Sequence, residues 1–196
     1  MAGFRALSAV GLSIVALLDR RFGEELGTTR PSVVLATTDD FEPANRKGAN
    51  ATIVPPSVSV YCYRLSIDRE TRPSLSARAS LDGIPRLPLR MHLLVSPWDL
   101  AASNELQWIG LAARVLESNS IISGPLLHPS GDWEPGDSIQ VVQDDVALET
   151  MSEAFQAFDY QYRLCLPYLA RVVRIDGDRE PRAERVATVL TGAVPS

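Results

Sequence analysis

Few side chains in this sequence could act as acids, bases or nucleophiles. There are two histidines, His92 and His128, and two cysteines, Cys62 and Cys165. Imidazole is the usual general base near neutral pH, so a hydrolase with its site around His92 or His128 is one hypothesis. Neither cysteine has a neighbouring histidine or a helix start that would favour the thiolate, and both lie in apolar runs. We therefore expect buried free thiols, ordinary histidines and no catalytic residue.

Metal and phosphate sites need ligand spacings that this sequence lacks. It contains no H-E-x-x-H or C-x-x-C set for zinc and no glycine-rich phosphate loop. The acidic pairs 39–40, 144–145 and 176/178 could each hold a hard cation, but none follows the pattern of an EF-hand loop. We therefore expect no metal and no cofactor.

The overall charge is negative, and arginine supplies almost all of the positive groups. The formal net charge is −5, and Lys47 is the only lysine among 19 basic residues. Binding of nucleic acid or of an anionic membrane surface requires a basic face, so we expect neither as a partner. The planar fork of arginine suits pairing with carboxylates at protein–protein contacts.

Residues 6–18 are rich in apolar side chains and follow a basic residue, as in a signal peptide. However, the charged residues 19–21 come next, and no small-x-small cleavage site occurs. The apolar side chains recur instead at the spacing of one helix face: Leu7, Val10, Ile14, Leu17 and Leu18. The pattern predicts an amphipathic helix from about Gly3 to Glu25, ended by Gly27. No run approaches the roughly 20 apolar residues that cross a bilayer, so we expect neither a signal peptide nor a membrane segment.

Five segments have the β-branched and aromatic content of strands. They are residues 32–37, 57–65, 86–96, 138–143 and 162–175. In segment 57–65, Val58 and Val60 point to one face and Tyr61 to the other, which predicts a central strand covered on both sides. Segment 86–96 alternates between apolar and polar side chains, and Pro88 predicts an edge position at the start of this strand.

Two further segments have helical spacing. The first carries an apolar stripe at Leu106, Ile109, Gly110, Ala113 and Leu116, with Asp99 or Ser103 as a possible cap. The second is short and is marked by Leu148, Met151, Phe155 and Phe158. Strands and helices in this order predict an α+β fold, with one mixed β-sheet flanked by helices. We expect a single domain over residues 1–176 and a C-terminal tail over residues 177–196.

Several of these segments resemble a known family. The resemblance begins at SVSVYCYRL (57–65) and continues through PLRMHLLVSPW (88–98) and ELQWIGLAARVLESNSIISGPLL (105–127). It ends with ALETMSEAFQAF (147–158) and YRLCLPYLARVVRID (162–176). In this order they resemble the tail-terminator, or cap, family of extracellular contractile injection systems. These are phage-tail-like particles such as antifeeding prophages and Photorhabdus virulence cassettes.

The resemblance implies a fold like that of phage tail terminators and a structural rather than an enzymatic role. It also implies a hexameric ring that caps the inner tube and sheath and halts their polymerisation. Such a protein would assemble in the cytoplasm as part of the particle, which could then be released. The alternative from the residues themselves is a free-standing soluble module that binds a protein or a small apolar ligand without catalysis.

Contacts with neighbouring proteins would have to come from exposed segments. We expect arginines of the connection 68–83 to reach carboxylates on tube, sheath or a neighbouring cap subunit, and the C-terminal tail to clasp a neighbour. The candidate interface residues are Arg69, Arg72 and Arg78 in the connection, and Arg179, Arg182, Val186, Val189 and Leu190 in the tail.

Overall fold

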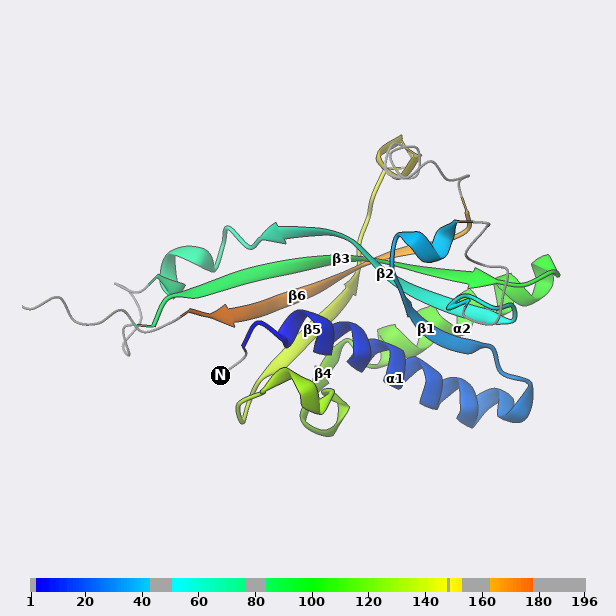
Figure 1. The fold of residues 1–196 in the computed structure, drawn as a ribbon, viewed down its shortest axis with the longest axis horizontal. Helices are drawn as coiled ribbons and strands as arrows, with labels where there is room; N and C mark the ends of the chain where they lie inside the picture. Colours follow the sequence, from blue (N-terminus) through cyan, green and yellow to red (C-terminus); the bar gives the residue numbers. More distant parts are fainter. Residues whose placement is uncertain (1–2, 43–50, 77–83, 148, 153–162, 178–196) are drawn as a thin grey trace, which may run out of the picture.

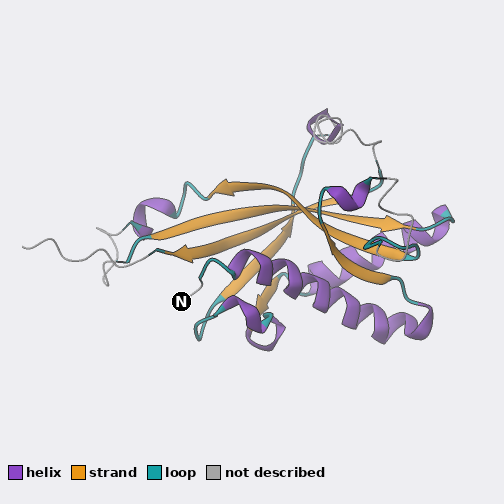
Figure 2. Ribbon diagram, in the orientation of Figure 1, coloured by secondary structure: helices purple, strands orange, loops and turns teal. Residues whose placement is uncertain are grey.

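A mixed β-sheet carries two long helices on one face (Figure 1, Figure 2). The computed structural model describes residues 3–42, 51–76, 84–147, 149–152 and 163–177. The two α-helices are α1 (Ala6–Leu26) and α2 (Ala102–Ser118). The strands are β1 (Ser32–Ala36), β2 (Ser57–Ile67), β3 (Arg86–Trp98), β4 (Ile121–Ser123), β5 (Ser138–Gln143) and β6 (Leu166–Asp176). The predicted α+β fold, with one mixed sheet flanked by helices, is confirmed.

The strands are ordered β1-β2-β3-β6-β5-β4. β1 runs parallel to β2, and all other neighbours are antiparallel. The predicted strands are all present, and β4 is an addition that the sequence did not predict because only three residues form it. Residues 178–196, which include the predicted tail contacts, lie outside the described part of the chain.

Helix α1 packs along the centre of the sheet and forms the main core with it. Val10, Ile14 and Phe22 are buried in one core cluster with residues of β1, β2, β3 and β6. Gly11 allows the close approach, because a Cβ there would lie 2.9 Å from Cδ1 of Leu35 in β1. The helix ends as predicted at Gly27, which has a φ of 61° and donates its N–H to the carbonyl of Gly23. Within the described residues, no helix is long and apolar enough to cross a membrane.

The three central strands extend beyond their neighbours. β1 pairs with β2 only as far as Tyr61, and β5 pairs with β6 only over 168–171. Beyond these points β2, β3 and β6 continue together as a three-stranded arm, formed by residues 62–67, 86–92 and 172–176 (Figure 1). The prediction that β2 is central is confirmed for its first half, whereas Leu65 and Ile67 in the arm are about half-exposed.

β3 lies between β2 and β6, so it is not an edge strand over most of its length. The edge position predicted at its start is confirmed in part: the pairing of β2 ends at Ile67, opposite Leu89, whereas Pro88 still pairs with Arg174 of β6. The carbonyl of Pro88 accepts a 3.0 Å hydrogen bond from the N–H of Asp68, one residue past the end of β2. The N–H that proline lacks would point to the same side as this carbonyl, toward Asp68. The carbonyl of Asp68 instead accepts from the N–H of Arg72 at 3.1 Å, so β2 loses no ladder bond.

The buried face of α2 differs from the predicted stripe. Trp108, Ile109, Ala112, Val115 and Leu116 are buried, whereas Leu106 and Gly110 face outward. Apolar residues cover more than half of the circumference of this helix, so spacing alone did not fix which face packs on the sheet. Neither predicted cap is used, because the N-cap is Ala101 and Asp99 Oδ1 accepts from the N–H of Ala101 at 2.8 Å.

The two leucines of α2 give a matched test of this packing. Leu116 is 1% exposed and Leu106 is 61% exposed. Leu116→Ala should lower the free energy of unfolding by about 2–5 kcal/mol, because it leaves a cavity in the core. Leu106→Ala should change it by less than about 0.5 kcal/mol. Urea unfolding of both variants measures the difference, and equal losses would contradict this orientation of α2.

Candidate charged interface site

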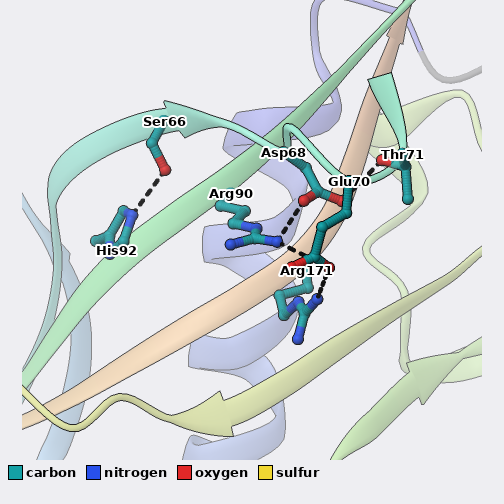
Figure 3. A network of polar contacts seen from close by, with 7 residues as sticks. All are labelled: Ser66, Asp68, Glu70, Thr71, Arg90, His92 and Arg171. Carbon is teal, nitrogen blue, oxygen red and sulfur yellow. Dashed lines mark hydrogen bonds and ion pairs between the residues drawn. The ribbon is translucent and has the colours of Figure 1, made fainter. Parts of the chain in front are cut away.

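The face of the sheet opposite α1 is divided into an apolar end and a charged end. At the apolar end, Tyr61, Leu94 and Trp98 form a second core cluster with Phe41 and Ile53. At the other end, on the arm and in the segments beside it, seven polar residues form two sets of contacts, and we call them together the arm network (Figure 3). They are Ser66, Asp68, Glu70, Thr71, Arg90, His92 and Arg171.

Asp68 is the buried centre of the arm network. It follows β2 directly and is fully buried, and it forms an ion pair with Arg90 Nη2 and accepts a 2.7 Å hydrogen bond from Thr71 Oγ1. Burial alone would raise the pKa of Asp68. The hydrogen bond from Thr71 and the charge and hydrogen bond of Arg90 outweigh burial, so the pKa lies below its ordinary value of 3.8. Asp68 is therefore a carboxylate at neutral pH.

Two arginines from adjacent strands lie side by side beside Asp68. Glu70 lies between them, 3.4 Å from Arg90 Nη2 and 3.3 Å from Arg171 Nη2, and is itself 74% exposed. Figure 3 shows both guanidinium groups directed at this carboxylate. The Nε atoms of Arg90 and Arg171 are buried and have no hydrogen-bond partner within the described residues. Because Glu70 is exposed, its own pairs contribute little to stability.

A second group of contacts holds the imidazole of His92. Its Nε2 lies 2.8 Å from Ser66 Oγ, and its Nδ1 lies 3.2 Å from Asp144 Oδ2. This is the connectivity of a Ser–His–Asp hydrolase triad, and His92 is mostly buried. Acyl transfer also requires N–H donors aimed at the developing oxyanion. Ser66 lies inside β2, paired with Arg90, and no α-helix of the described chain begins beside it.

His128 and the cysteines have structural surroundings. The backbone N–H of His128 donates to Ser13 Oγ of α1 at 2.7 Å, and its Nδ1 lies 2.8 Å from Ser130 Oγ. Cys62 and Cys165 are free thiols, as predicted, and Cys165 is buried whereas Cys62 is only partly buried. Burial raises the pKa of Cys165 to about 11 and also raises the pKa of Cys62, so neither is a ready nucleophile. Within the described residues, no group of three His, Cys, Asp or Glu side chains could hold a metal.

The structure places two of the predicted interface arginines beside the arm network. Arg69 and Arg72 follow Asp68 in the chain and are exposed, whereas Arg78 and all five tail candidates lie outside the described residues. Arg69 lines an open depression of about 610 Å³. The other residues that line it are Arg64, Ser66, Ile67, Glu70, Arg90 and His92.

The contributions of Arg64, Arg90 and Arg171 were not predicted. Arg90 and His92 fall on the polar face of an alternating strand, which was a usable signal. The strand order that brings β2, β3 and β6 together is not local information, so the partners of these residues could not be found from spacing.

The fold is similar to that of two tube-terminating proteins. One similar structure is a cryo-EM structure of an extracellular contractile injection system, the PVC sheath/tube terminator in its extended state. It has a TM-score of 0.54 and 17% identity, covering 94% of this chain and 65% of that chain. The anti-feeding prophage tube-terminating cap has a TM-score of 0.52 and 15% identity, covering 94% and 60%. The chain thus spans less than two thirds of either protein, and at these identities the likeness concerns the fold.

A family model gives the more specific assignment. The model of the Pvc16 N-terminal domain matches residues 9–188, and the chain belongs to this family. The resemblance to tail terminators of contractile injection systems, inferred above from the sequence, is confirmed. No curated protein matches the chain.

Replacement of the buried carboxylate tests the arm network. Asp68→Asn keeps the shape but leaves Arg90 with only the exposed Glu70 as its counter-charge. We expect the free energy of unfolding at neutral pH to fall by about 3 kcal/mol, the low end for breaking a buried ion pair.

The pH dependence gives this test its control. A carboxyl group with a lowered folded pKa stabilises the protein above its unfolded value and loses that contribution as the pH falls through the folded pKa. The difference between wild type and Asp68→Asn should therefore be largest well above pH 3.8 and should shrink below it. A difference that does not change with pH would mean that the charge of Asp68 does not contribute to stability.

Proposed function

We propose that this chain is the structural terminator subunit of a contractile injection system, which forms a hexameric ring that ends the inner tube and the sheath. The observation that carries the proposal is the family match over residues 9–188, together with a fold similar to two terminators over 94% of the chain. The absence of a catalytic motif in the sequence agrees with a structural role.

The physical requirement of a terminator is asymmetry. Identical rings stack head to tail and never close by themselves, so growth ends only when a subunit fits the last ring and presents a different surface beyond it. A rigid sheet with projecting connections meets this need, because the sheet fixes positions and the connections recognise neighbours. The arm, with Arg69 and Arg72 at its end, is one such projection. Arg78 and the tail residues 179–190 remain predicted contacts.

The partners follow from the same proposal. They are further copies of this chain and the tube and sheath proteins of the particle, and neither nucleic acid nor a membrane is among them. Assembly takes place in the cytoplasm, and the particle is retained or released as a whole. No cofactor is required, because the function is mechanical.

Oligomeric state and particle length test this function. Native mass spectrometry and negative-stain microscopy of the purified chain should show six-fold rings. Particles from a strain that lacks the gene should have tubes of uncontrolled length or sheaths detached at one end. If the purified protein stays monomeric, and tubes end normally in the strain that lacks the gene, the free-standing binding module is supported instead.

The Ser66–His92–Asp144 geometry favours one second candidate, a serine hydrolase, and a separate experiment decides it. A fluorophosphonate probe reacts with serines that are activated by a neighbouring base. We expect no labelling of the wild-type protein, because Ser66 lies in a paired strand without oxyanion donors. Labelling that is lost in Ser66→Ala and in His92→Ala, but kept in His128→Ala, would establish the hydrolase.

A further inference from the structure

The arm carries more positive charge than its own carboxylates neutralise. Arg90 and Arg171 pair with Asp68 and Glu70, and Arg174 pairs with Asp137 at 3.0 Å. In contrast, Arg64, Arg69 and Arg72 are exposed and form no ion pair with any residue that the structure describes. Three unneutralised cations therefore lie on the arm and in the segment that follows β2, in a chain whose formal net charge is −5.

The register of β2 and β3 places two of the basic groups around the depression. Arg64 is directly opposite His92, and Ser66 is directly opposite Arg90. Side chains two residues apart point to the same face of a strand, so Arg64 stands beside Ser66. Arg69 lines the same depression from the turn after β2. Glu70 is the only carboxylate among the lining residues, and it is already engaged with Arg90 and Arg171.

Two features suit this depression to a carboxylate. The guanidinium groups of Arg64 and Arg69 are free to form bidentate pairs, which are directional and stronger than neutral hydrogen bonds. The floor is rigid, because His92 is held on both nitrogens and Arg90 is fixed by the buried Asp68. A preorganised site loses little freedom on binding.

We propose that the depression lined by Arg64, Arg69 and His92 receives an acidic side chain from a second copy of this chain. This inference rests on the proposed ring. In a ring of identical subunits each contact is heterologous, so a patch on one flank meets a different surface of the next copy. Carboxylates outnumber basic groups on this chain, 24 against 19, so a second copy can supply an acidic partner for a basic patch. Beyond Tyr61, β1 no longer pairs with β2, so this edge of the arm is not covered by β1.

The test is a double charge reversal with a matched control. Arg64→Glu/Arg69→Glu should lower the association constant between subunits by at least about tenfold, measured by native mass spectrometry across protein concentrations. The control is Arg20→Glu/Arg21→Glu on α1, whose side chains are 50% and 42% exposed and which changes the net charge equally. We expect the control to assemble like wild type. Added salt should weaken the wild-type ring more than the ring of the double variant.

The outcomes separate this inference from the function on which it rests. A wild-type chain that forms no ring contradicts the proposed function. If the wild type forms rings but Arg64→Glu/Arg69→Glu changes the association constant by less than twofold, the carboxylate site is contradicted and the proposed function is not. An equal loss of association in the control variant has the same meaning. Thermal unfolding of each variant establishes that it folds, and Arg64→Lys/Arg69→Lys, which keeps the charge, should restore part of the association.

Discussion

The packing of α1 on the sheet is the interaction on which the rest of the structure depends. It joins residues of β1 and of the three central strands β2, β3 and β6 in one core cluster. Val10, Ile14 and Phe22 are buried there, and each fully buried apolar side chain contributes roughly 1.5–3 kcal/mol. This contact fixes the centre of the sheet. The three strands can then project as an arm beyond β1 and β5, because their register is already set where they are covered.

An arm without a helix on its outer face needs another way to hold its shape. The same sheet face is apolar where Tyr61 and Trp98 are covered and charged where the arm is open. A buried ion pair adds little net stability compared with apolar packing, because its charges lose water. Here Asp68 is fully buried and the side chain of Arg90 is 24% exposed. Its directional contacts nevertheless admit few arrangements, so Asp68 and Arg90 serve to fix the end of β2 against β3.

Local pattern predicted most of the elements, and contacts between distant residues account for most of what it missed. The strands, α1 and the glycine that ends it follow from periodicity and backbone preference within a few residues. Pro88 predicted an edge at the start of β3 because proline lacks an N–H. At Pro88 the pairing with β2 has ended and only Asp68 follows on that side, but the pairing with β6 continues. The candidate site was predicted only at Arg69 and Arg72. Arg64, Arg171 and Asp144 join it through strand order and through contacts as far apart as 101 residues.

The contacts of His92 also show why the connectivity of a catalytic triad is not enough to predict hydrolase activity. Ser66, His92 and Asp144 have the connectivity of a catalytic triad, yet a nucleophile must be presented to a substrate beside donors that stabilise negative charge. Here the imidazole of His92 contacts Ser66 and Asp144 on one face of the sheet. Ser66 itself lies in a strand that is paired at this position with Arg90 of β3. Such an arrangement immobilises His92 as part of a floor. A fixed floor ringed by arginines suits recognition of a protein surface better than turnover of a substrate, which agrees with the family to which the chain belongs.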